Sequence, residues 1–332
     1  MTHDAVAELI GAWALDACPP DETELVEAHL GTCDTCATEA GALREAAADL
    51  GGAYLRPPAT SLSRLLAAAP ARRRPAAQDL PYAAQTAALD LLLSDLTPDE
   101  WRRPAFDSLT VKDVVAHLAA TDSLVADALG LPASPPISSP LSPAARTEVV
   151  LSFESERSPE QTHQSWRSQA DSLCRAATSH PAPSTVTVTL SRPFPLADAL
   201  TARAYETWIH GEDIAAATGR PPLPPLPGHI HPMADLAARL LPRVVSRRLS
   251  STEVIHLHLT GPGGGTWTVP LDPATVASAA VEPAATVTLD VIEFCRLAGA
   301  RRTPSQLAIT TEGDTALAGA FLAAVPSMAP VP

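Results

Sequence analysis

The sequence predicts a multi-domain, mainly α-helical protein with a small helical domain, a four-helix bundle and a C-terminal α+β domain. Its 332 residues are too many for one small domain. Apolar residues recur at helical spacing over most of the first two-thirds, whereas strand-like alternation is concentrated in the last third. Proline clusters at 57–58 and 221–225 mark boundaries. We therefore expect domains at residues 1–70, 79–225 and 226–326, with a linker at 71–78.

The composition excludes several classes of function. No apolar run reaches the roughly 18 residues of a membrane-spanning helix, and the first residues lack the basic and apolar regions of a signal peptide. A net charge of −14 argues against direct nucleic-acid binding, because phosphate backbones need clustered lysine and arginine. We expect a cytoplasmic protein with no membrane partner. The five cysteines, two of them in a C-x2-C pair beside a histidine, indicate metal binding and not a disulfide framework.

Three helices are predicted in the first 50 or so residues. Apolar residues recur at helical spacing from Ala5 to Ala14. Pro19-Pro20 ends that helix and starts the next, which has acidic residues in its first turn. A third helix is expected from residue 37 to about 50. A short amphipathic segment over residues 62–69 follows it.

A metal-ligand motif stands at the turn into the third helix. His29, Cys33 and Cys36 form an H-x3-C-x2-C run, which is thiolate-rich and suits a closed, structural zinc. Such a site takes four ligands, so the fourth must come from upstream, and His3 and Cys18 are the candidates. Because a domain of about 50 residues has little core, the metal would supply a large share of its stability.

The bundle is predicted from four helical segments and their end signals. The segments are residues 82–96, 110–129, 159–177 and 196–217. Thr110 and Asp113 have the spacing of a capping box, with Asp in place of Glu. Gly219 supplies a C-terminal stop, and a loop rich in proline and serine is expected over 132–144. Bundle cores are common places for metals.

A second metal-ligand set lies on two of these helices. Glu206 and His210 stand four residues apart and therefore share a helix face. His117, near the middle of another helix, can meet them in an antiparallel bundle. Two histidines and a carboxylate leave a fourth position for an exchangeable ligand, as in catalytic zinc sites. Asp213, three residues past His210, either orients that imidazole or serves ordinary helix packing.

The last third alternates between helices and strands. Helices are expected over residues 232–245, 291–298 and a final stretch to about 324, with strands near 254–259, 266–269, 286–289 and 307–310. This mixture predicts a small α+β domain.

The first 70 or so residues closely resemble the zinc-binding anti-sigma domain of actinobacteria. The resemblance is carried by His3, Leu9-Ile-Gly-Ala-Trp13 and His29-Leu-Gly-Thr-Cys33-Asp-Thr-Cys36. It implies His3, His29, Cys33 and Cys36 as zinc ligands, and an extracytoplasmic-function sigma factor as the partner of these helices and of residues 62–69. Cys18 is then either inert or a redox partner of Cys33 or Cys36.

Residues from about 80 to 325 resemble the mycothiol-dependent maleylpyruvate isomerase family. The resemblance is carried by residues 91–101, 109–118 and 203–221. It implies a DinB-like bundle with a sterol-carrier-like C-terminal domain, and His117, Glu206 and His210 as ligands of zinc or another divalent metal. The open position would take the thiol of mycothiol.

The same resemblance implies an arginine from the C-terminal domain near the active site. The stretch Gly299-Ala-Arg301-Arg302 is the nearest match to the family's glycine-arginine pair. The inserted Ala300 leaves both Arg301 and Arg302 as candidates. Together with Asp213 they are the expected catalytic residues.

These expectations combine into a regulator. The zinc domain would sequester a sigma factor, and the bundle would respond to thiol status or a ligand. The alternative is a mycothiol-dependent isomerase or thiol transferase whose zinc domain is regulatory. A metal-binding scaffold without turnover is a third possibility.

Overall fold

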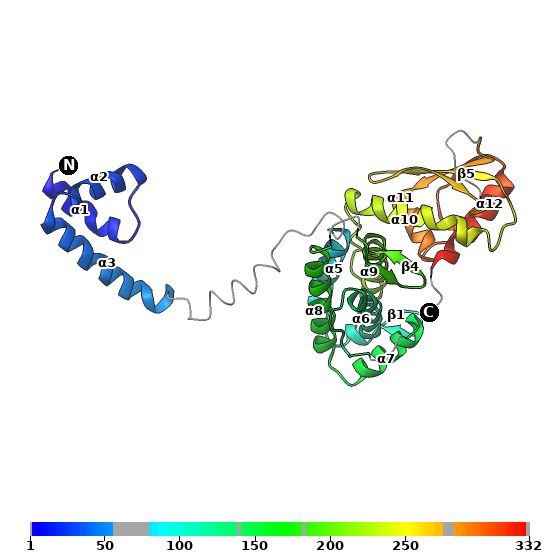
Figure 1. Cartoon of the computed structure of the whole chain (residues 1–332), viewed down its shortest axis with the longest axis horizontal. Coiled ribbons are helices and arrows are strands. Elements are labelled where there is room, and N and C mark those ends of the chain that lie inside the picture. Colours follow the sequence, from blue (N-terminus) through cyan, green and yellow to red (C-terminus); the bar gives the residue numbers. More distant parts are fainter. Residues whose placement is uncertain (1, 56–79, 138–140, 181–183, 275–281, 330–332) are drawn as a thin grey trace. The chain divides into compact units, whose positions relative to one another are not determined.

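The computed structural model describes residues 2–55, 80–137, 141–180, 184–274 and 282–329 (Figure 1). The chain divides into two compact units, Met1–Arg72 and Arg73–Pro332. The expected amphipathic segment at 62–69 and the linker at 71–78 lie outside the described residues. Within the described ranges, no helix has the length and apolar character needed to cross a membrane.

The first unit contains the three expected helices, α1 (His3–Ala14), α2 (Pro20–Leu30) and α3 (Asp34–Leu55). Helix α3 begins three residues earlier and ends five residues later than expected, so Cys36 lies in its first turn. A small core holds the helices together, and Cys36 belongs to it. Its buried members are Val6, Ile10, Val26, Cys36 and Ala40.

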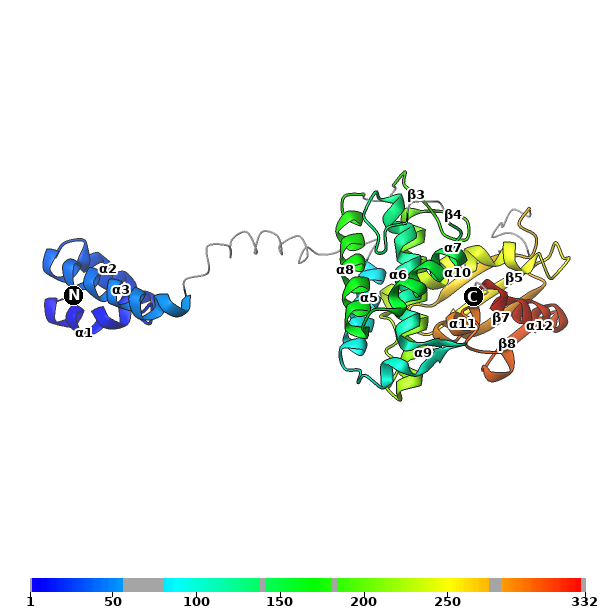
Figure 2. The ribbon, with the colours of Figure 1, turned by 90° about the horizontal axis from the view of Figure 1, so that it is seen from below.

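The second unit begins with five α-helices. They are α5 (Leu80–Ser94), α6 (Val111–Ala128), α7 (Pro143–Ser155), α8 (Pro159–Ala177) and α9 (Leu196–Thr218). The four expected helices are confirmed, and in Figure 2 α5, α6, α8 and α9 run side by side. Thr110 and Asp113 form both hydrogen bonds of the capping box, and Gly219 ends α9 with a left-handed φ of 72°.

Helix α7 lies in a stretch for which the sequence predicted no helix, and it packs against α6. Ser142 caps it by accepting a hydrogen bond from the Ala145 backbone. Two short antiparallel hairpins complete this part of the chain. The first pairs β1 (Pro104–Phe106) with β2 (Leu109–Thr110), and the second pairs β3 (Thr187–Thr189) with β4 (Pro193–Pro195).

The C-terminal part is a four-stranded sheet with helices. Its elements are α10 (Pro227–Val245), β5 (Val254–Thr260), β6 (Gly265–Pro270), β7 (Ala285–Asp290), α11 (Val291–Ala298), β8 (Thr310–Gly313) and α12 (Thr315–Ala324). The strand order is β6-β5-β7-β8, with β5 and β7 parallel and the other pairs antiparallel. Helix α10 starts five residues before the expected position, and the last strand lies three residues later than expected.

One core runs from the bundle into the sheet. Leu200 on α9, Leu257 on β5 and Phe294 on α11 are fully buried members of the same cluster. This continuity explains why everything after Arg73 forms a single compact unit. It also fixes the segment after α11 against α9, which carries two of the expected metal ligands.

Candidate metal centres

In the first unit, the structure brings together His3, His29, Cys33 and Cys36. Their ligand atoms all lie within 4.8 Å of one another. The His3 Nδ1 atom lies 3.1 Å from the Cys36 Sγ atom and 3.7 Å from the Cys33 Sγ atom. Each helix contributes: His3 starts α1, His29 is in the last turn of α2, and the cysteines stand at the start of α3.

Cys18 is not part of this group, and its thiol donates a hydrogen bond to the Leu9 carbonyl at 3.7 Å. The four grouped residues fit a zinc ion. The Nε2 atom of His29 is buried without a hydrogen-bond partner among the described residues, as expected for a nitrogen placed to bind a metal. Two thiols and two imidazoles are also a donor set of closed zinc sites.

The two thiols of this group differ in their acidity. The pKa of Cys33 is lowered to about 6 by a hydrogen bond from the Cys36 backbone and another from the His3 side chain. Burial raises the pKa of Cys36. Cys33 is therefore a thiolate at neutral pH, which is the form that binds metal.

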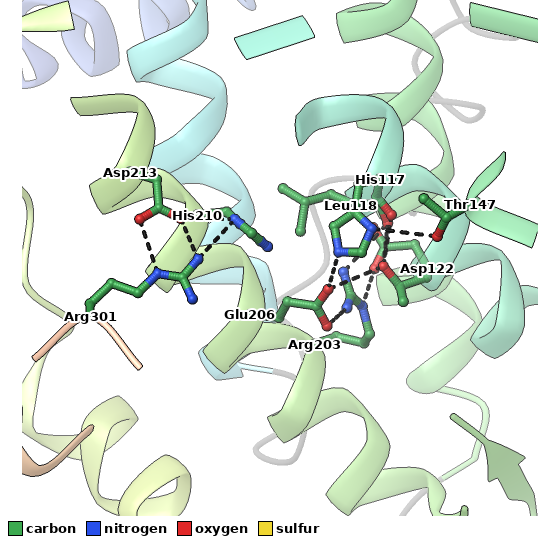
Figure 3. A network of polar contacts seen from close by, with 10 residues as sticks. His117, Leu118, Asp122, Thr147, Arg203, Glu206, His210, Asp213 and Arg301 are labelled. Carbon is green, nitrogen blue, oxygen red and sulfur yellow. Dashed lines mark hydrogen bonds and ion pairs between the residues drawn. The ribbon is translucent and has the colours of Figure 1, made fainter. Parts of the chain in front are cut away.

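In the second unit, the structure brings together His117 from α6 with Glu206 and His210 from α9 (Figure 3). Their ligand atoms also lie within 4.8 Å of one another. His117 Nε2 is 2.8 Å from Glu206 Oε1, and the two imidazole rings are 5.3 Å apart. The side chain of His210 is 7% exposed, whereas the side chains of His117 and Glu206 are each 23% exposed. The group is thus accessible from one side, and its donors suit zinc or a similar divalent ion.

Asp213 and Arg301 hold His210 in place. The Nδ1 atom of His210 lies 3.0 Å from Asp213 Oδ2, and the other Asp213 oxygen accepts a hydrogen bond from Arg301 Nε at 3.0 Å. Because the partner is a carboxylate, Nδ1 carries the ring proton and Nε2 is left as the metal-binding atom. The Arg301 guanidinium also lies 4.1 Å from the centre of the Phe106 ring, which packs edge-on against His210.

The structure brings Arg301 to this group, whereas Arg302 lies beside Glu293 with 3.3 Å between Nε and Oε2. Ala300 precedes both arginines and has a positive φ of 58°, so the chain turns sharply after α11. Beyond this turn, Arg301 reaches Asp213 on α9, whereas Arg302 reaches Glu293 on α11.

A buried set of polar residues behind Glu206 was not predicted from the sequence. Arg203 pairs with Glu206 Oε2 and donates from Nε to Asp122 Oδ1 at 2.7 Å. The Tyr82 hydroxyl donates to the other Asp122 oxygen at 2.8 Å. Arg203 stands three residues before Glu206, so the helical spacing that identified the ligands could also have located it. On α7, the Thr147 hydroxyl lies 3.4 Å from His117 Nδ1.

Charge and burial compete at these carboxylates. Burial raises the pKa of Glu206, but the nearby charge of Arg203 and a hydrogen bond from His117 outweigh burial and hold that pKa well below its usual range. Burial dominates at Asp122 and raises its pKa despite Arg203. Glu206 is therefore ionised and available as a metal ligand.

Comparisons with known proteins agree with this division. Residues 4–37 match a zinc-finger family model, and residues 82–215 match the model of the mycothiol maleylpyruvate isomerase N-terminal domain. Both resemblances are confirmed. The isomerase-like bundle therefore corresponds to the part of the chain that carries His117, Glu206 and His210.

Relatives and solved structures match about 70% of the chain. Uncharacterized proteins from two strains of Mycobacterium tuberculosis are each 27% identical over 236 residues, which is 69% of this chain and 86% of the relative. Two crystal structures of the mycothiol-dependent maleylpyruvate isomerase, one of a mutant, align with TM-scores of 0.48 and 0.47. Their identities are 16% and 15%, over 71% of this chain and 91% of theirs.

Proposed function

We propose that the protein is a zinc-binding anti-sigma-type regulator fused to a mycothiol-dependent metal-binding domain. The observation that carries this proposal is the group of His3, His29, Cys33 and Cys36, whose ligand atoms lie within 4.8 Å of one another in a unit with its own core. In this proposal zinc binds the four side chains and holds α1, α2 and α3 as a platform for an extracytoplasmic-function sigma factor. Binding of the sigma factor keeps it from transcription.

The bundle supplies the response to a thiol or another ligand. His117, Glu206 and His210 would hold zinc or another divalent metal, and Asp213 fixes the proton of His210. Such an ion would acidify a bound thiol, so that a thiolate is present at neutral pH. In this proposal Arg301 positions His210 through its hydrogen bond to Asp213. Arg302 lies beside Glu293 instead of the metal ligands, and its catalytic role stays a prediction.

Two further expectations belong to the same proposal. The four-stranded sheet with α10, α11 and α12 would be a sterol-carrier-like domain, and its role is to place Arg301 against the bundle. The protein would act in the cytoplasm, where mycothiol and sigma factors are found together.

The sigma-factor part is tested by co-purification of the full chain with extracytoplasmic-function sigma factors of the same genome. The wild-type protein should retain one of them in a 1:1 complex. Cys36→Ser should lose it, because a zinc ligand is removed. Cys18→Ser is the matched control, since Cys18 lies in the same unit but outside the ligand group. Failure of the zinc-loaded wild-type protein to retain any of these factors contradicts the proposal.

A second candidate function is a mycothiol-dependent isomerase or thiol transferase. It is favoured by the exposure of the His117 and Glu206 side chains, 23% each, which leaves the metal group accessible to a substrate. Thiol-dependent turnover that is lost in His117→Ala would support it. His163→Ala is the matched control, because His163 on α8 binds Asp90 on α5 and is not part of the metal group. Sigma-factor binding without turnover would favour the regulator.

A further inference from the structure

Three helices contribute to a buried ionic network behind Glu206. Tyr82 on α5, Asp122 on α6 and Arg203 on α9 are all fully buried. Hydrogen bonds of 2.8 Å and 2.7 Å join the Tyr82 hydroxyl and Arg203 Nε to the two oxygens of Asp122. Another guanidinium nitrogen of Arg203 bonds Glu206 Oε2 (Figure 3). The network therefore ends on a candidate metal ligand.

Stability of the bundle does not account for this network. Taking an ion out of water carries a large desolvation cost, and well-packed apolar residues of similar volume are often as stable as a buried ion pair. The network also places one guanidinium between two carboxylates. The network instead fixes the orientation of the Glu206 carboxylate, because Arg203 bonds both Asp122 and Glu206.

The two oxygens of Glu206 are used differently. Oε2 is occupied by Arg203. Oε1 faces His117 Nε2 at 2.8 Å and the Thr121 hydroxyl at 3.4 Å. One oxygen is thus turned towards the ligand nitrogens, and the other is held away from them.

We propose that Arg203, anchored by Asp122 and Tyr82, is a positioning residue that makes Glu206 offer a single oxygen to a bound metal. A carboxylate that bound through both oxygens would fill a further coordination position. Arg203 therefore keeps that position open for an exogenous thiol. The role of the thiol rests on the proposed function of the bundle, whereas the orientation of Glu206 does not.

The test uses the cobalt(II)-loaded full chain, because cobalt(II) reports its coordination number in its visible spectrum. Subtraction of the spectrum of His117→Ala protein removes the contribution of the N-terminal site. N-acetylcysteine serves as the monothiol probe. The variants are Arg203→Met and Tyr82→Phe. Tyr205→Phe is the matched control, because Tyr205 is a tyrosine of α9 whose hydroxyl bonds the Cys295 carbonyl instead of the network.

We expect the wild-type protein and Tyr205→Phe to share one visible band and one affinity for the thiol. Arg203→Met should give a weaker, shifted band, because the second Glu206 oxygen becomes free to bind. It should also bind the thiol more weakly, by about 10- to 100-fold, which is the range in which loss of such a partner lowers metal affinity or activity. Tyr82→Phe should change the visible band and the thiol affinity in the same direction as Arg203→Met, but by a smaller amount.

The proposal is overturned if Arg203→Met and Tyr82→Phe give the same visible band and the same thiol titration as Tyr205→Phe. If Arg203→Met does not fold, Tyr82→Phe decides, and an unchanged band in that variant overturns it. If cobalt binds but no protein binds the thiol, the proposed function of the bundle fails. The band difference between Arg203→Met and Tyr205→Phe then still decides whether Arg203 orients Glu206.

Discussion

Removal of zinc should unfold the first unit and leave the second unit folded. The first unit has few large apolar side chains in its core, with Val6, Ile10 and Val26 fully or almost fully buried. Burial of such a side chain stabilises by about 1.5–3 kcal/mol. A structural zinc stabilises by about 10–16 kcal/mol at neutral pH, and an entire domain is usually stable by only about 5–15 kcal/mol. The metal-free unit is therefore expected to be unfolded.

Hydrogen exchange measured by mass spectrometry can follow this unfolding peptide by peptide. After chelation, with metal loss checked by elemental analysis, amide protection should disappear from α1, α2 and α3, which contain 12, 11 and 22 residues. Peptides from α8 serve as the internal control. Cys36→Ser should lose the same protection without a chelator, and Cys18→Ser should keep it. Protected amides in α1 and α2 of the metal-free protein would refute the reasoning.

Three further predictions concern the second unit. Asp213→Ala should weaken divalent-metal binding by the bundle about 10- to 100-fold, since His210 loses the acceptor of its ring proton; competition with a chromophoric chelator measures this, and unchanged affinity contradicts it. A side-chain hydrogen bond from Arg220, followed by bonds from Thr97, lowers the pKa of Glu100 from 4.5 to about 2. The pKa of Glu100 is lower in the folded than in the unfolded protein, so ionised Glu100 stabilises the fold above about pH 4.5, and this stabilisation is lost as the pH falls to 2. The difference in denaturation midpoint between wild type and Glu100→Gln should therefore shrink between about pH 4.5 and about pH 2. A difference that stays constant would show that ionisation of Glu100 is not its cause. Thr110→Ala should lower the free energy of unfolding, measured in urea, by about 1 kcal/mol, because it removes the cap of α6. A decrease of less than a few tenths of a kcal/mol would show that the cap is dispensable.

The helices that could be predicted from the sequence are those with apolar faces and clear end signals. Thr110 with Asp113, and Gly219, identified ends of α6 and α9 because their side chains or backbone satisfy local hydrogen bonds. Helix α7 has no such apolar face. Its buried positions, four residues apart, are Arg146, Val150 and Glu154, so two of three carry charges, and hydrophobic periodicity fails to detect the helix.

In the candidate sites, too, the sequence predicts what depends on local spacing and misses what depends on contacts between helices. Four-residue spacing on one helix located Glu206 and His210, because that spacing depends only on local geometry. His117 lies on another helix, and the family resemblance was needed to join it to this pair. Arg203 is fully buried, although charged residues normally lie outside, so its role depends on Asp122 from another helix. The choice between Arg301 and Arg302 could not be made from residue types, because it depends on which of two adjacent side chains meets Asp213 from another helix.

The charges of the two ligand sets give a physical reason for assigning them different tasks. Zinc bound by two thiolates and two neutral imidazoles, as at Cys33, Cys36, His3 and His29, has no net formal charge and has its four ligands. A divalent ion bound by two neutral imidazoles and Glu206 would keep one positive charge, because Asp122 already balances Arg203. In a partly buried site such a charge favours an anionic fourth ligand, and a thiolate provides that anion. The first set is thus suited to structure, and the second to capturing a thiol.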